Sequence, residues 1–304
     1  MIAENSMCQS LIRRFRTIFA LYRARAQSQK FRNAYEDFVT YQSQTGCKGA
    51  FILCGYPKSG NTWFRFVYHN LVNTLQNDSD RTLTYSALNE FQANMFFPDP
   101  FFEGTFLPPS GVQYGDNPIM FHSHNRWTPL WQAFGPVVFI YRHPLDTMVS
   151  MWYATVYFRQ DNRGKISLDD FTKSNFPAWI DTFKTNFQGA NVAISYEEMR
   201  KKPIETFDLC FKNLGIKFTS QALVRAVEVS NFKSIRKMED TSGEHHGHQR
   251  TGAWFNDKGI RFTRSGESGQ WVSELQADTV KYCVDLLCSA GVDIDLFDGL
   301  HQSD

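Results

Sequence analysis

The sequence predicts an α/β domain of the P-loop type, with three α/β/α layers and a central parallel sheet. Short apolar runs alternate with longer mixed segments from about residue 50 onward, which is typical of βαβ units. One of these runs leads through a glycine-bounded loop directly into an amphipathic helix. The chain has 304 residues, of which 42% are hydrophobic. It can therefore bury a substantial core, and intrinsic disorder is excluded as its main state.

Each expected element follows from a local pattern. Short apolar runs predict buried strands, and apolar residues at helical spacing predict helices. The expected strands are 50–55, 118–123, 137–142 and 191–196. The expected helices are 60–75, 144–158, 168–186, 203–214, 219–227 and 275–289. Two long stretches, 91–110 and about 239–272, are rich in Pro, Gly or polar residues, so we expect functional loops there rather than regular elements.

Residues 1–45 form a basic helical extension in this interpretation, and residues 46–304 form the domain. Residues 1–35 contain seven Lys and Arg residues and one acidic residue, and their apolar residues recur at helical spacing. Two interpretations stay open for this helix. It packs on the domain or a partner subunit, or it makes peripheral contact with a membrane surface.

Composition argues against several classes of protein. Thirty-two Lys and Arg residues against 31 Asp and Glu residues give a formal charge of +1, which does not favour a nucleic-acid partner and means that any anion site is local. The six Cys residues lack paired spacing, which argues against a disulfide scaffold and favours a reducing, cytoplasmic compartment. The apolar runs are far shorter than the roughly 20 residues that cross a bilayer, and no secretory signal is expected. His245, His246 and His248 lack fixed acidic or Cys partners, so no metal site is expected there.

The strand at 50–55 leads into a loop that is suited to bind phosphate, Gly55-Tyr-Pro-Lys-Ser-Gly-Asn-Thr-Trp63. Consecutive backbone N–H groups and a helix N-terminus supply donors to an anion in such a loop. In the nucleotide P-loop frame, Asn61 stands where the Lys that reaches a triphosphate is expected. Lys58 comes three residues earlier. This displacement favours a different, shorter anion.

A second candidate phosphate site follows the strand at 137–142. Arg142 lies at the strand end, and Ser150 lies eight residues later on the expected helix. The guanidinium and the hydroxyl could hold one phosphate together through charge-assisted hydrogen bonds. Taken alone, Arg142 fits a structural salt bridge equally well.

The two motifs together closely resemble the 5′-phosphosulfate loop and the 3′-phosphate motif of sulfotransferases that use 3′-phosphoadenylyl sulfate (PAPS). Three later segments resemble the same family in the same order: Ile194–Met199, Ser230–Phe232 and Phe262–Trp271. The resemblance implies sulfuryl transfer from PAPS to an acceptor hydroxyl or amine by in-line displacement, with release of 3′-phosphoadenosine 5′-phosphate (PAP) and without a metal. The cofactor-binding residues that it implies are Lys58, Ser59, Gly60, Asn61, Thr62, Trp63, Arg142, Ser150, Tyr196, Ser230, Phe232, Arg264, Ser265 and Gly266.

Transfer to a hydroxyl requires removal of its proton, and His titrates in the right range for this task. The strand at 118–123 leads into His122-Ser-His124-Asn-Arg126. By the resemblance, His124 is the general base, and Lys58 contacts the bridging oxygen and the sulfuryl group. His122 stands where the family often has a Lys that contacts the sulfuryl oxygens. Either protonated His122 makes this contact, or Arg126 or another cation replaces it.

Several alternatives stay open at this stage. An ATP-dependent kinase is disfavoured by Asn61, Arg142 and Ser150, and a nucleotide-sensing module without catalysis is the third interpretation. The acceptor is a small molecule, a lipid or a glycan. The C-terminal pairing motif of many cytosolic relatives is not matched around Thr279 and Val280, which leaves a homodimer open.

Overall fold

The computed structural model describes residues 47–77, 114–158, 166–242 and 263–300, with parts of 35–43, residues 83, 84 and 88, and residues 93–94. The basic helix expected over residues 1–35 lies almost wholly outside the described residues, as do the three histidines at 245–248 and most of the stretch 91–110. Within the described ranges, no helix has the length and hydrophobicity needed to cross a membrane.

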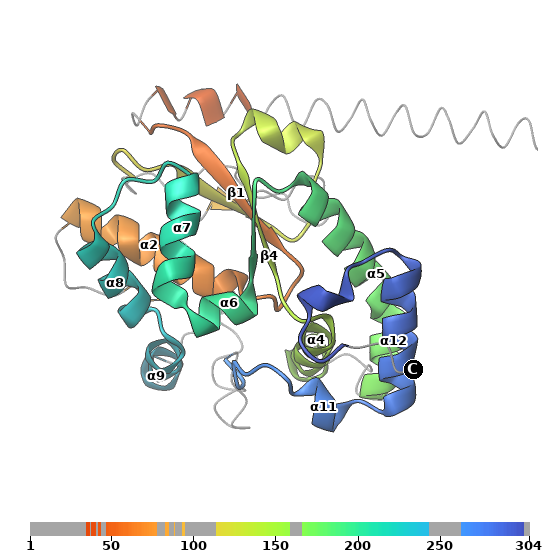
Figure 1. Cartoon of the computed structure of the whole chain (residues 1–304). Helices are drawn as coiled ribbons and strands as arrows, with labels where there is room; N and C mark the ends of the chain where they lie inside the picture. Colours follow the sequence, from red (N-terminus) through yellow and green to blue (C-terminus); the bar gives the residue numbers. More distant parts are fainter. Residues whose placement is uncertain are drawn as a thin grey trace, which may run out of the picture.

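A five-stranded sheet in the order β2-β3-β1-β4-β5 forms the centre of the fold (Figure 1). Its strands are β1 (Ala50–Gly55), β2 (Ala93–Asn94), β3 (Ile119–Ser123), β4 (Val137–Tyr141) and β5 (Val192–Ser195). All four strand pairs are parallel. The predicted α/β class with a central parallel sheet is therefore confirmed.

The core lies on both faces of β1, the middle strand. Leu53 of β1 is in register with His122 of β3 on one side and with Val138 of β4 on the other. Phe51, Ile52 and Leu53 are completely buried. Strands covered on both faces are apolar without alternation, and this explains why the sequence of β1 is continuously hydrophobic.

One helical layer contains α2 (Asn61–Asn77), α6 (Tyr196–Lys201), α7 (Pro203–Asn213), α8 (Ser220–Val229) and α9 (Phe232–Ser242). Helices α2, α7 and α8 lie together on one side of the sheet, and α9 continues from α8 (Figure 1). The Ser195 hydroxyl accepts a hydrogen bond from the Glu198 N–H and thereby begins α6 directly at the end of β5.

The other layer contains α4 (Pro144–Phe158), α5 (Leu168–Gly189), α11 (Trp271–Glu274) and α12 (Ala277–Ser289). These helices lie on the opposite side of the sheet, with α12 packed along α5 (Figure 1). Pro144 occupies the first position of α4, where the missing N–H costs no hydrogen bond. Two short 3₁₀ helices, η1 (Pro129–Ala133) and η3 (Ile294–Leu296), complete the described elements.

The prediction of irregular structure was wrong at the borders of both long stretches. Helix α9 includes residues 239–242, α11 begins at Trp271, and β2 lies inside the stretch 91–110. In α9, Ile235 and Glu239 are both buried at helical spacing, with 4% and 1% of their surface exposed. A buried glutamate interrupts the apolar pattern that reveals a helix in sequence, and α9 was not among the expected helices for this reason.

Candidate functional site

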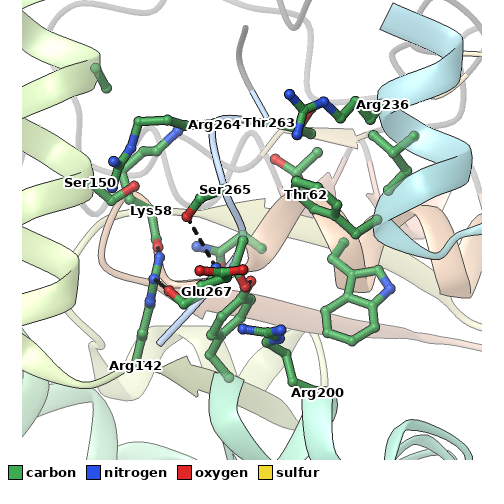
Figure 2. A pocket seen from close by; sticks show the side chains of 18 of the residues that line it. Lys58, Thr62, Arg142, Ser150, Arg200, Arg236, Thr263, Arg264, Ser265 and Glu267 are labelled. Atoms are coloured by element: carbon green, nitrogen blue, oxygen red, sulfur yellow. Dashed lines mark hydrogen bonds between the residues drawn. The ribbon is translucent and has the colours of Figure 1, made fainter. Parts of the chain in front are cut away.

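Four strands of the sheet end at the same edge, and a residue that the sequence analysis singled out lies just beyond each end. Lys58 follows β1, His124 follows β3, Arg142 follows β4 and Tyr196 follows β5. Parallel α/β sheets bind ligands outside the carboxyl ends of their strands. A cavity of about 1030 Å³ opens at this edge, and all four residues line it. Figure 2 labels two of them, Lys58 and Arg142.

The loop between β1 and α2 presents backbone donors to this cavity. Within the loop, the Ser59 N–H donates to the Tyr56 carbonyl at 3.2 Å and is therefore already used. The first N–H groups of an α-helix have no acceptor inside the helix. The N–H groups of Asn61 and Thr62, together with that of Gly60, are thus the donors left for an anion.

Lys58 has an unusual backbone conformation and a perturbed amine. Its φ of 74° is rare for a residue with a Cβ atom, and its carbonyl accepts a hydrogen bond from Arg142 Nη1 at 3.4 Å. Desolvation first, and the nearby Arg142 charge second, lower the pKa of Lys58 to about 8. An anion bound in the cavity would favour the charged amine.

Arg142 connects three parts of the site. It is 6% exposed, and its Nη2 donates to the Glu267 carbonyl at 2.7 Å. Its guanidinium carbon lies 4.6 Å from the ring centroid of Tyr196. Among the described residues, Arg142 forms no ion pair with a carboxylate, so the salt-bridge interpretation does not describe this structure. The guanidinium is instead held by carbonyl groups and a ring at the cavity wall.

The segment 263–271, which we call the closing segment, forms another wall of the cavity. The Tyr196 hydroxyl donates to the Gly266 carbonyl at 2.7 Å. Gly266 has a φ of +68° and packs on Phe232, such that a Cβ atom would lie 2.7 Å from that ring. The Arg264 guanidinium lies 4.1 Å from the ring centroid of Tyr153 on α4. The segment is therefore held against α4, α6 and α9 together.

His124 is oriented by the end of the neighbouring strand. Its Nδ1 lies 2.7 Å from the Gly55 carbonyl oxygen, which can only accept a hydrogen bond. Nδ1 therefore carries the proton, and Nε2 of the neutral ring keeps its lone pair. Desolvation is the main cause that lowers the pKa of His124, with smaller contributions from the positive charges of Arg65 and Lys58. The ring of His122 is perpendicular to that of His124, with 4.5 Å between centroids.

All the expected nucleotide-binding residues line the cavity except Ser59 and Ser230. The Ser59 side chain is buried, with 1% of its surface exposed. Ser230 is fully buried at the end of α8, where its hydroxyl accepts a hydrogen bond from Asn70 Nδ2 at 2.9 Å. Arg126 does not line the cavity, because it forms an ion pair with Asp181 at 3.0 Å on the surface.

The lining also includes residues that the sequence analysis did not select. They include Arg200, Lys233 and Arg236. Arg200 follows Tyr196 by four residues and Arg236 follows Phe232 by four, so the helical spacing after each motif residue was the signal that could have found them.

Most of the charged side chains that line the cavity are positive. Of the lining residues that the structure describes, six are Lys or Arg and a single one, Glu267, is acidic. In Figure 2, Lys58, Arg142 and Arg264 lie at the left end of the cavity. Arg236 and Arg200 lie toward its right end, one above and the other below. A nearly neutral chain thus concentrates positive charge in one cavity, which suits a ligand with several negative charges. In the described part of the chain, no group of three or more His, Cys, Asp and Glu residues could hold a metal ion.

Comparison with known proteins gives consistent matches. The family model described as "Sulfotransferase domain" matches residues 48–287. Cytosolic sulfotransferase 17 of Arabidopsis thaliana is 24% identical over 251 residues, which is 76% of this chain and 70% of that protein. Cytosolic sulfotransferase 16 of the same plant is 23% identical over 247 residues, which is 74% of this chain and 71% of that protein.

Solved structures share the fold. The mouse sulfotransferase SULT7A1, complexed with PAP, superposes with a TM-score of 0.58 at 18% identity and covers 83% of this chain and 87% of its own. Retinol dehydratase, in complex with androsterone and the inactive cofactor PAP, has a TM-score of 0.59 at 15% identity and covers 82% of this chain and 81% of its own. At these identities the likeness establishes the three-layer fold alone.

Proposed function

Because the chain belongs to the sulfotransferase family and is a PAPS-dependent enzyme of that family, we propose that it transfers the sulfuryl group of PAPS to a hydroxyl of an organic acceptor, with His124 as the general base. The observation that carries this proposal is the hydrogen bond between His124 Nδ1 and the Gly55 carbonyl. It leaves the basic Nε2 of a cavity-lining histidine available on the same sheet edge as Lys58.

The cavity provides separate places for the parts of the donor. The N–H groups of Gly60, Asn61 and Thr62 bind the 5′-phosphate, as expected for a helix N-terminus. Arg142, Ser150 and the closing segment bind the 3′-phosphate at the end of the cavity where positive charge is densest. Trp63, Tyr196 and Phe232 supply aromatic surface for the adenine.

The reaction needs one proton removed and one developing charge stabilised. PAPS supplies a sulfuryl group whose bond to the phosphate oxygen breaks as a new S–O bond to the acceptor forms. His124 accepts the acceptor hydroxyl proton on Nε2, and its depressed pKa keeps the ring neutral and ready to do so at pH 7. Lys58 donates to the phosphate oxygen that takes up negative charge.

We further propose that His122, rather than Arg126, contacts the sulfuryl oxygens. His122 is buried, lines the cavity and lies beside His124. The Arg126 guanidinium pairs with Asp181 outside the cavity, and both side chains are more than half exposed. The positions of the two side chains thus support His122 over Arg126 for this contact.

For the acceptor we propose a small organic molecule, with a hydroxyl preferred over an amine. The fold neighbour retinol dehydratase is described with androsterone bound, and androsterone carries such a group. The relatives are named cytosolic sulfotransferases, and we propose a cytosolic location for this chain as well. Membrane contact through the basic helix and homodimer formation stay predictions.

Calorimetric titration of the full chain with PAP, ADP and ATP, each with and without Mg²⁺, tests the donor. We expect micromolar binding of PAP, about −8 kcal/mol, and much weaker binding of the other two nucleotides. Arg142→Ala should abolish this preference, and Arg225→Ala on α8, outside the cavity lining, serves as the matched control. Preference for ATP with Mg²⁺ would overturn the proposal in favour of a kinase.

A further inference from the structure

The closing segment is anchored at both ends by buried carboxylates that belong to other elements. Asp146 of α4 holds its C-terminal end, and Glu239 of α9 holds its N-terminal end. Each of these carboxylates is 1% exposed. Neither of them lines the cavity.

Asp146 uses both of its oxygens on backbone groups of the segment. Oδ2 accepts a hydrogen bond from the Gly269 N–H at 2.6 Å, and Oδ1 accepts one from the Trp271 N–H at 3.2 Å. These contacts bridge more than 120 residues of sequence. An asparagine here could accept only one of the two hydrogen bonds, because its amide nitrogen is a donor.

Both contacts between Glu239 and Thr263 use the same carboxylate oxygen. Oε2 accepts from the Thr263 hydroxyl at 2.6 Å and from the Thr263 N–H at 3.3 Å. A glutamine could keep both contacts with Thr263 but would remove the negative charge, which acts on Lys58 as well.

Between the anchors, the segment turns its backbone toward the nucleotide site. Thr263, Arg264, Ser265 and Gly266 line the cavity, and the Gly266 and Glu267 carbonyls accept from Tyr196 and Arg142. A buried carboxylate costs free energy unless hydrogen bonds compensate it. Two such groups beside a cavity for an anion also oppose ligand binding by charge. The presence of these two carboxylates is explained if they orient the backbone that contacts the ligand.

We propose that Asp146 and Glu239 are positioning residues that hold the closing segment over the 3′-phosphate of the nucleotide, and thereby set the preference for 3′-phosphorylated over unphosphorylated nucleotide. This inference rests on the proposed function. In this inference neither carboxylate contacts the ligand. Both act by positioning the backbone of residues 263–271.

The experiment compares the affinities of PAP and adenosine 5′-monophosphate in full-length variants. Asp146→Asn should weaken the binding of PAP by roughly tenfold or more and the binding of the monophosphate by less than about threefold, because only one of two charge-assisted hydrogen bonds survives. Glu239→Ala should have a similar selective effect, because it removes both contacts with Thr263. Asp278→Asn and Glu228→Gln remove the same charges at exposed positions, and they serve as matched controls.

Hydrogen exchange of the unliganded wild-type protein gives a second test that does not depend on any variant folding. The amides of Gly269 and Trp271 should be protected, and in Asp146→Asn they should exchange faster. Equal losses for PAP and the monophosphate, or unprotected amides in the wild type, would each overturn the inference. Absence of PAP binding to the wild type would instead overturn the proposed function.

Discussion

Gly60 lies so close to the ring of Tyr196 that a Cβ atom on it would be 2.7 Å from Cδ2 of that ring. Gly60 directly precedes α2, the helix after β1, and Tyr196 begins α6, the helix after β5. The phosphate-binding loop therefore packs directly on the residue whose hydroxyl holds the closing segment. We therefore expect a change in the phosphate-binding loop to shift the ring of Tyr196 and, with it, the closing segment.

This contact predicts a strong and specific effect of Gly60→Ala. The backbone at Gly60 has a φ of +106°, and the added methyl group also displaces Tyr196. We expect a lower free energy of unfolding and a large loss of PAP affinity, measured by urea denaturation and calorimetry. Gly215 is the matched control, because its φ is +67° and no atom lies within 4 Å of a built Cβ. Gly215→Ala should cost about 1–2 kcal/mol of stability and leave PAP affinity unchanged. Equal PAP affinities in the two variants would contradict the packing argument.

The lowered pKa of Lys58 predicts that PAP binding depends on pH. The amine has a pKa of about 8 in the free protein, so its charged form is lost as pH rises through 8. A bound anion favours the charged amine, and binding above pH 8 must therefore take up a proton. PAP affinity should fall by up to about tenfold per pH unit above 8 and should change little near pH 7, where Lys58 is charged.

Calorimetry in buffers of different ionisation enthalpy measures this proton uptake directly. Lys58→Met should bind PAP more weakly and without the uptake. Lys173→Met on α5, outside the cavity, should behave like the wild type. Uptake that persists in Lys58→Met would assign the titration to another group.

The environment of His124 predicts the acid limb of the activity profile. Desolvation places the pKa of this histidine below its ordinary value of 6.5, so the neutral base persists to lower pH than in a free histidine. We expect kcat to stay level as pH falls to 6.5 and to decline only below it. His124→Gln should reduce kcat by roughly 10²–10⁴-fold while PAP affinity stays near wild type, because the residue moves a proton and does not hold the nucleotide. Parallel losses of kcat and PAP affinity would show a structural role instead.

The sheet and most of the helices were predictable because their signals are local. The strands at 50–55 and 137–141 are unbroken apolar runs, and helices such as α4 start at a proline after a strand. Helix α9 was not predicted, since the buried Glu239 stands on the face that sequence reasoning expects to be apolar. Its partner Thr263 lies 24 residues away in sequence.

The site residues were likewise predictable where their signals are local and not where they depend on distant contacts. Lys58, Arg142 and Tyr196 follow strand ends, and parallel strands bring such residues to one edge. Ser230 shows what the motif could not specify, because its hydroxyl is used by Asn70, 160 residues earlier in sequence. Whether a hydroxyl two residues before α9 faces the cavity or α2 depends on how two distant helices pack.

The last prediction separates the two cations that the sequence left as alternatives. If His122 contacts the sulfuryl oxygens, His122→Ala should lower kcat at least roughly tenfold, since one charge-assisted donor to the reacting group is lost. Arg126→Ala removes only a surface ion pair, whose side chains are 56% and 63% exposed, and such pairs contribute about 0–1 kcal/mol to stability. That variant should keep kcat within about twofold of wild type. His122→Lys provides a third arm, because an amine at this position can make the same contact and should retain more activity than alanine. Steady-state assays of PAP formation with a saturating acceptor measure all three, and a larger loss in Arg126→Ala than in His122→Ala would reverse the assignment.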